Sequence, residues 1–136
     1  MERFGLDLVG FARLQPDLLL PFRARDWVAA VGKSYAGSEV IDTLKLLTSE
    51  LATNALKHGG TSGVVRVALL TCRSGLRVEV TDEGGGVPVP RDASDDDEDG
   101  RGLFLLDVLA RSWGHDLAPD GKGTVVWFEV DIPPSA

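Results

Sequence analysis

Residues 39–58 read EVIDTLKLLTSELATNALKH, and this stretch decides the fold because its apolar positions repeat with the period of a helix. At about 100° per residue, five apolar side chains fall in one narrow stripe that must face a core. These are Val40, Leu44, Leu47, Leu51 and Ala55. Ser38 is a suitable N-cap, and Gly59 and Gly60 close the segment, so we predict a helix from residue 39 to about residue 58.

The same predicted helix carries polar residues beside its apolar stripe. Glu50, Asn54 and Lys57 follow one another at spacings of four and three residues, which places them along one side of the helix. A carboxylate can orient or deprotonate a hydroxyl, an amide oxygen suits Mg²⁺, and a cation meets phosphate charge. The alternative is a solvated polar edge, which is the more common case for a single helix. Glu50 and Asn54 argue against it because they border the stripe instead of lying opposite it.

Helices and strands are expected on both sides of this segment. Apolar residues repeat at every second position in the expected strands and about every 3.6 positions in the expected helices, and turn residues separate these segments. The predicted elements are a strand at 4–9, a helix at 22–31, a hairpin of strands at 64–70 and 76–81, a helix at 103–113 and a strand at 124–131.

Three further features have a bearing on chemistry. Asp82 lies in TDEGGGVP, at the end of the apolar side of a predicted strand, where a half-buried carboxylate needs a hydrogen-bond partner. Residues 100–103 read GRGL at an expected helix start, whose free N–H groups favour an anion. Residues 121–124 read GKGT, a tight turn into a strand. Each of the three, taken alone, also fits a plain turn or helix start.

Two familiar nucleotide-binding patterns are missing from the sequence. Residues 31–34 read VGKS, but a P-loop needs a glycine where Trp27 stands, and no GxGxxG occurs. His58, His115 and Cys72 do not have metal-ligand spacing, so no zinc site is expected.

The length and composition predict one domain. The chain has 136 residues, of which 43% are hydrophobic and 26% charged, the balance of a globular protein. This is too short for two ordinary domains, so we expect a single domain over residues 1–136.

The net charge of −7 is concentrated in one segment. Six of the negative charges come from Asp92 and residues 95–99, so the rest of the chain is nearly neutral. Acidity disfavours direct contact with nucleic acid phosphates. Gly, Pro, Asp and Ser dominate this part of the chain, which predicts a flexible acidic lid at about 84–100. The simplest interpretation of its charge is a solvated loop, and docking to a basic partner surface is the alternative.

Neither a membrane nor an oxidising compartment is expected. The longest apolar runs, such as 18–20 and 103–106, are far shorter than the roughly 20 residues of a membrane helix, and no charged-then-apolar leader precedes them. The one cysteine, Cys72, cannot form an internal disulfide, and its strand-like surroundings favour a small core residue. We therefore expect a cytoplasmic protein.

Taken together, these features resemble the GHKL (Bergerat-fold) ATPase superfamily, and closely the anti-sigma-factor serine/threonine protein kinases. ELATNALKH (50–58) is similar to the N box, TDEGGG (81–86) to the first glycine box and GRGLFLLDVLA (100–110) to the second, and the turn at 123–124 is similar to the last. The resemblance spans at least residues 39–130. It implies an α/β (α+β) two-layer sandwich with a mixed, mainly antiparallel sheet, helices on one face, and ATP held between helices and a lid.

The resemblance also implies a role for each matching residue. Glu50 would be the catalytic base, Asn54 a Mg²⁺ ligand and Asp82 the carboxylate that binds adenine. The other nucleotide-binding residues would be Gly84, Gly86, Gly100, Gly102 and Thr124, with Lys57 or His58, and Arg101, as phosphate contacts. The acidic lid is a departure, because its charge would repel ATP phosphates unless the loop swings outward or is screened by cations.

The resemblance implies protein partners as well. A kinase of this type phosphorylates Ser or Thr of an anti-anti-sigma partner and otherwise holds a sigma factor. The length favours a stand-alone module, and neither His58 nor His115 fits a phosphoaccepting histidine. Arg23 and Arg25 are candidate partner contacts, and a homodimer is suggested by the resemblance alone. Two alternatives stay open: an ATP-binding module that sequesters a partner without turnover, and a fragment of a larger sensor kinase.

Overall fold

The computed structural model describes residues 5–58, 63–82, 104–118, 121 and 123–134, and the structural statements below concern these residues. A short helix over residues 104–109 precedes the fourth strand. The other elements, in chain order, are β1 (Asp7–Leu14), α1 (Leu20–Gly32), α2 (Ser38–His58), β2 (Val65–Cys72), β3 (Gly75–Asp82), β4 (Ser112–Leu117) and β5 (Thr124–Asp131).

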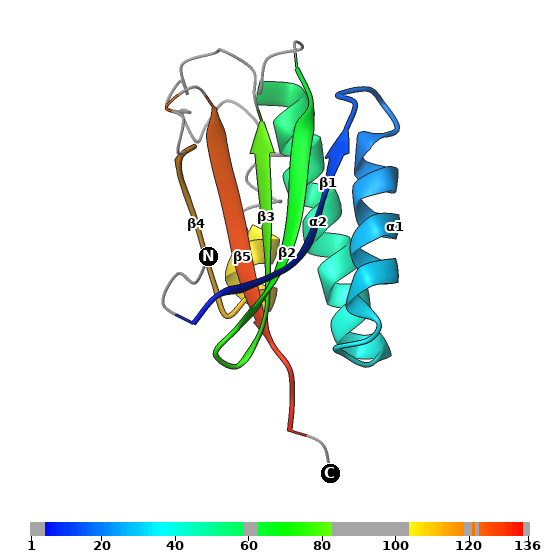
Figure 1. Ribbon diagram of the computed structural model, residues 1–136, viewed down its shortest axis with the longest axis vertical. Helices are drawn as coiled ribbons and strands as arrows, with labels where there is room; N and C mark the ends of the chain where they lie inside the picture. Colours follow the sequence, from blue (N-terminus) through cyan, green and yellow to red (C-terminus); the bar gives the residue numbers. More distant parts are fainter. Residues whose placement is uncertain (1–4, 59–62, 83–103, 119–120, 122, 135–136) are drawn as a thin grey trace.

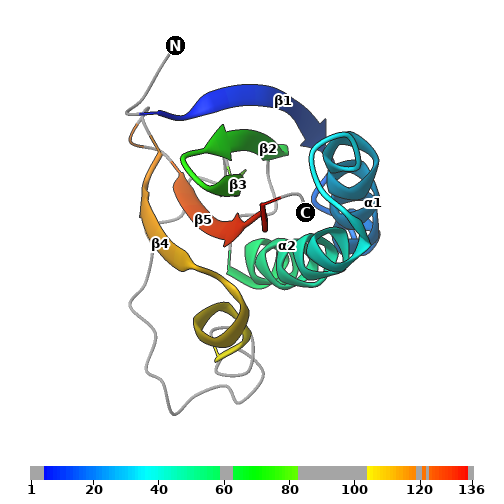
Figure 2. The ribbon, with the colours of Figure 1, turned by 90° about the horizontal axis from the view of Figure 1, so that it is seen from below.

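The five strands form one sheet in the order β1-β2-β3-β5-β4, and every pair of neighbours is antiparallel. α1 and α2 pack against each other and cover one face of this sheet (Figure 1; Figure 2). The predicted α+β fold with helices on one face is therefore confirmed. No helix in the described part of the chain is long and apolar enough to cross a membrane.

The core lies between the helix layer and the sheet. The predicted stripe of α2 is confirmed, because Leu44, Leu47 and Leu51 are at most 2% exposed. Opposite them, the side chains of β2 and β3 alternate as expected, with Leu76, Val78 and Val80 buried. These contacts hold α2 against the middle strands and thereby fix the position of its polar side.

Among the described side chains of α2, Thr48 is buried and polar. It is 0% exposed, and its hydroxyl has no hydrogen-bond partner among the described residues. A buried hydroxyl without a partner loses its hydrogen bonds to water and so reduces the stability of the fold.

The predicted helix at 103–113 is wrong in its second half. Within the described residues the helix covers 104–109, and residues 112–117 form the edge strand β4. Gly114 can pair with Trp127 of β5 because it has no side chain. A Cβ at this position would lie 2.8 Å from the Trp127 ring. The indole nitrogen of Trp113 donates a 2.7 Å hydrogen bond to Asp107, which joins β4 to the short helix.

The first strand lies further along the chain than predicted, at Asp7–Leu14 instead of 4–9. Its register shifts between Leu8 and Gly10, so the alternation of side chains is interrupted there. As a result Val9 packs against the core while Leu8 is 55% exposed.

The helix ends differ from the predictions by one or two residues. α1 includes Leu20 and Gly32, two residues and one residue beyond the predicted ends. Ser38 is the first residue of α2 instead of its N-cap, and the carbonyl of Gly37 accepts the hydrogen bond from the Ile41 amide at 3.0 Å. Differences of this size are common at helix ends.

The sheet face away from the helices carries a cluster of charged and aromatic side chains. Arg77 donates hydrogen bonds to Glu79 at 2.8 Å and to Glu129 at 3.0 Å. Its guanidinium lies over the ring of Trp127. The strand pairing explains this cluster, because Glu129 is opposite Arg77 and Trp127 is opposite Glu79.

Candidate functional site

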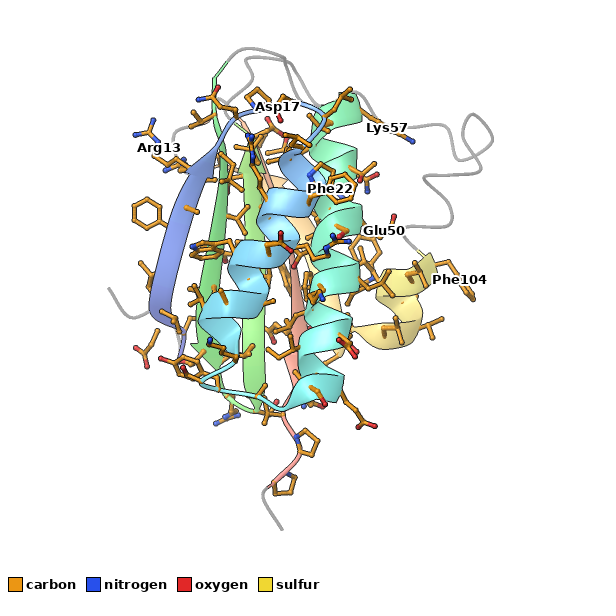
Figure 3. The ribbon with its side chains drawn as sticks, turned by 90° about the vertical axis from the view of Figure 1, so that its right-hand side faces the viewer. Arg13, Asp17, Phe22, Glu50, Lys57 and Phe104 are labelled. Atoms are coloured by element: carbon orange, nitrogen blue, oxygen red, sulfur yellow. The ribbon has the colours of Figure 1, made fainter. Side chains whose placement is uncertain are left out.

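The C-terminal half of α2 presents the predicted polar residues. Glu50 and Asn54 are half-buried one helical turn apart, and Lys57 is exposed near the end of the helix. Figure 3 shows Glu50 and Lys57 on the side of α2 that faces the short helix carrying Phe104. The neighbouring Leu51 and Ala52 are buried, so packing fixes the helix rotation that exposes this side.

Asp82 is the last residue of β3, as predicted. It has the same parity along the strand as Val78 and Val80, whose side chains are buried under the helices. Asp82 is half-buried, and its main chain pairs with Val65 of β2. A carboxylate is therefore placed at the rim of the layer between the sheet and α2.

A tight turn leads into β5 beside this carboxylate. The Gly121 amide donates to the Ala118 carbonyl, and the Ala118 amide donates to the Gly123 carbonyl, both at 2.8 Å. Gly123 is buried, and a Cβ there would overlap the backbone carbonyl of Asp82. Thr124, the predicted pocket residue, is half-buried at the first position of β5.

These segments gather at one end of the molecule. The C-terminal end of α2, the end of β3 and the start of β5 all lie at the top of Figure 1. α2 packs against both β3 and β5. The structure thus brings Lys57, Asp82 and Thr124 to the same end, with Asn54 and Glu50 below them on α2.

The remaining predicted site residues lie outside the description. Gly84, Gly86, Gly100, Arg101 and Gly102 are not among the described residues, nor is the predicted lid, and the structure describes the backbone of His58 but not its side chain. One relationship was missed by the sequence reasoning, namely the contact of Gly123 with Asp82. The glycine pair in GKGT was the signal for a tight turn, but nothing in it indicates which strand the turn touches.

Two shallow hollows lie at the opposite end of the sheet. They have volumes of about 350 and 520 Å³ and share Glu39, Val40 and Pro133 in their walls. Neither is lined by a residue of the predicted site, so we do not place the chemistry there.

A comparison with known protein families identifies the family of this chain. The family model described as "Histidine kinase-like ATPase domain" matches residues 16–130, which is most of the chain. The chain belongs to this family. The match includes α2, the end of β3 and the turn into β5, so all described residues of the candidate site lie inside the ATPase domain.

Two relatives share part of their sequence with this ATPase domain. It is 33% identical over 98 residues to "Blue-light-activated histidine kinase 2" of Erythrobacter litoralis, covering 70% of this chain and 28% of that protein. It is 42% identical over 77 residues to an uncharacterized protein of Streptomyces coelicolor, covering 54% of this chain and 73% of that protein.

A solved structure shares the fold of the ATPase domain. The histidine kinase domain of a blue-light-activated histidine kinase from Erythrobacter litoralis superimposes with a TM-score of 0.52 and 23% identity. The superposition covers 81% of this chain and 62% of that one. The chain therefore spans about three tenths of the sensor kinase it matches in sequence and under two thirds of the solved domain.

The residues of this ATPase domain fit the ATP and Mg²⁺ that the family name and the resemblance imply. There is no room for a side chain at position 123 beside Asp82. The end of β3, which would contact the adenine base, is therefore closely packed. The described residues hold no group of three His, Cys, Asp or Glu that could bind a metal ion by themselves. A single amide such as Asn54 suits Mg²⁺, which usually keeps several waters and takes its other ligands from phosphates.

Proposed function

We propose that this chain is an ATP- and Mg²⁺-dependent serine/threonine protein kinase of the anti-sigma-factor type, which phosphorylates an anti-anti-sigma partner and sequesters a sigma factor. One observation carries the proposal. Glu50 and Asn54 are half-buried one turn apart in the C-terminal half of α2, the helix that ends at the same end of the sheet as β3 with its last residue Asp82. A carboxylate that could act as base, an amide that could bind magnesium and a carboxylate that could bind the purine thus come from α2 and β3 of a histidine kinase-like ATPase domain.

Each residue would act through its position. Asp82 would accept a hydrogen bond from the exocyclic amine of adenine, and Asn54 would bind Mg²⁺ through its amide oxygen. Mg²⁺ supplies charge neutralisation on the transferred phosphate. Glu50 would orient the acceptor hydroxyl and take its proton, and Lys57 at the helix end would face the phosphates.

The histidines of this chain are not the proposed phosphate acceptors. His115 lies on the edge strand β4, and His58 is the last residue of α2. The acceptor in the proposal is a hydroxyl of a partner protein.

The start of α1 is the surface that we assign to the partner. Leu18 is 87% exposed and Phe22 is 53% exposed, so two large apolar side chains reach the surface here. The guanidinium of Arg25 lies 5.1 Å from the centre of the Phe22 ring, and Arg23 pairs with Asp17 at 3.4 Å. Figure 3 shows Asp17 and Phe22 at the end of the molecule near Lys57. Arg25 also lies 3.8 Å from Asp26, so an apolar surface bordered by balanced charges suits an amphipathic partner with charged residues of both signs.

Replacing the proposed base tests the kinase activity. We expect Glu50→Gln to bind ATP with Mg²⁺ as the wild type does but to lose about 100-fold or more of its transfer rate, because general base catalysis contributes this much. The matched control is Glu39→Gln, an exposed residue in the first turn of the same helix. The readout is a mass gain of one phosphate on Ser or Thr of the anti-anti-sigma proteins of the source organism.

The outcomes separate the proposal from its alternatives. Transfer by Glu50→Gln at the wild-type rate would show that Glu50 is not the base. ATP binding without transfer to any of these proteins would favour the binding module that acts by sequestration. Phosphate on a histidine of a longer chain that contains this domain would favour the sensor kinase.

A further inference from the structure

We propose that Gly123 is a positioning residue for Asp82 and thereby determines the selectivity of the site for adenine over other bases. The inference rests on the proposed function in one respect, namely that Asp82 meets the base of the nucleotide.

The contact between the two residues is direct. A Cβ added to Gly123 would overlap the backbone carbonyl oxygen of Asp82 and would lie 3.5 Å from its side-chain Oδ1. Glycine is the one residue that lets two main chains approach so closely. Any side chain at position 123 must therefore move the end of β3 or the turn before β5.

The strand pairing shows why Asp82 depends on this contact. The β3–β5 ladder ends with Thr81 opposite Val125, so Asp82 lies one residue beyond it. On its other side Asp82 still pairs with Val65 of β2. On the side of β5, beyond the end of the ladder, Gly123 packs directly against the carbonyl of Asp82.

Gly123 is itself held from the far side. Its carbonyl accepts the 2.8 Å hydrogen bond from the amide of Ala118, a residue that is 4% exposed at the end of β4. Gly123 therefore lies between the amide of Ala118 and the carbonyl of Asp82. A movement of Gly123 away from Asp82 would break the hydrogen bond with Ala118, so we expect a new methyl group to displace Asp82.

A hydrogen bond to a base is sensitive to such a displacement. The distance and angle ranges of a good hydrogen bond are narrow, and a shift of about 1 Å removes it. Phosphate contacts on α2 would be unaffected, because Asn54 and Lys57 are on another element. A change at Gly123 should therefore reduce recognition of the base and leave the recognition of phosphate intact.

The chain offers a matched control at the other end of the same ladder. A Cβ at Gly75, the first residue of β3, would overlap the backbone carbonyl of Val130 in the same way. Gly75 is also buried, but it lies at the end of the sheet opposite to Asp82. Gly75→Ala thus introduces a similar steric conflict between β3 and β5 away from the nucleotide.

The experiment is calorimetric titration of the full chain with ATP and with inosine triphosphate, which lacks the exocyclic amine, both with Mg²⁺. For Gly123→Ala we expect the ATP affinity to fall by roughly tenfold to a hundredfold, the value of one hydrogen bond to a charged group. The affinity for inosine triphosphate should hardly change, so the preference for ATP disappears. Gly75→Ala should keep the wild-type preference even if its unfolding midpoint falls as much.

A double variant tests whether Gly123 acts through Asp82. Gly123→Ala combined with Asp82→Asn should bind ATP no more weakly than Asp82→Asn alone, because the two changes remove the same contact. Additive losses would overturn the positioning role. So would a Gly123→Ala protein that keeps the wild-type preference for ATP, or an equal loss of preference in Gly75→Ala.

Failure of the proposed function would look different. A wild-type chain that binds neither nucleotide would refute nucleotide binding itself, whatever the variants do. If Gly123→Ala does not fold, amide spectra of the ¹⁵N-labelled wild type decide instead. The Asp82 and Gly123 signals should shift together with ATP and less with inosine triphosphate, while Gly75 stays in place. Identical shifts with both nucleotides would overturn the inference.

Discussion

The guanidinium carbon of Arg77 lies 3.9 Å from the centre of the Trp127 ring, on the sheet face that the helices leave open. The same guanidinium pairs with Glu79 and Glu129, and the three charged side chains are 12–20% exposed. Pairs shielded to this degree keep more of their Coulomb energy than pairs on an open surface. The cluster therefore links β3 to β5 on the face opposite the core.

Removing the cation of this cluster should destabilise the fold. Arg77→Met leaves two carboxylates facing each other without it, and we expect a loss of about 2 kcal/mol in the free energy of unfolding. Urea unfolding of the variant measures it. Adding Glu79→Gln and Glu129→Gln to Arg77→Met should restore part of the loss, and a triple variant no more stable than Arg77→Met would contradict this account.

The buried hydroxyl of Thr48 gives a prediction of opposite sign. Thr48→Val keeps the shape of the side chain and removes a polar atom that has no partner in the described part of the chain, so we expect the protein to gain about 1 kcal/mol of stability. The control is Thr43→Val on the same helix, whose hydroxyl donates a 3.2 Å hydrogen bond to the Glu39 carbonyl. Thermal unfolding should show a gain for Thr48→Val and none for Thr43→Val. A loss in Thr48→Val would imply a buried partner for the hydroxyl.

Asn54 should determine how ATP binding depends on magnesium. We expect Asn54→Ala to bind ATP with Mg²⁺ at least about tenfold more weakly than the wild type. Removing a residue that only hydrogen-bonds to a metal ligand already lowers metal affinity by about this factor. With EDTA the variant and the wild type should bind ATP equally. Asn54→Asp keeps an oxygen ligand and should retain the magnesium effect. Titrations with and without Mg²⁺ test this, and an unchanged magnesium effect in Asn54→Ala would exclude it as a ligand.

Asp131 should contribute to the pH dependence of stability. The hydrogen bond from Ser74 and the one from Arg111 hold its pKa below the ordinary value of 3.8. Because the pKa of Asp131 is lower in the folded state, its carboxylate stabilises the fold at pH values above 3.8. This contribution disappears as the pH falls below 3.8 and passes through the folded-state pKa. Unfolding midpoints between about pH 6 and pH 2 should therefore fall less steeply for Asp131→Asn than for the wild type. Parallel curves would show that the carboxylate makes no such contribution.

Local patterns in the sequence were sufficient for the middle of the chain. α2 was predicted almost to the residue because its stripe runs over its whole length, and Glu50 and Asn54 were located with it. The strands around Leu69 and Val78 followed in the same way from alternation and a turn.

The parts that the sequence did not reveal depend on distant partners. β4 is held as a strand by contacts with other elements, because Gly114 leaves room for the ring of Trp127 on β5 and Trp113 bonds to Asp107. The shift in β1 comes from an interrupted register with β2, which no periodicity shows. The contact of Gly123 with Asp82 likewise joins residues that are far apart in the chain.

If α2 serves both for packing and for the proposed chemistry, the two uses have a consequence for how variants behave. In a library of single substitutions along this helix, changes at the Leu44, Leu47 and Leu51 positions would lower the amount of folded protein in the cell. Changes at Glu50 and Asn54 would leave that amount nearly constant and lower turnover per molecule. Positions that affect abundance and positions that affect specific activity would therefore alternate along one helix, each set recurring about every 3.6 residues.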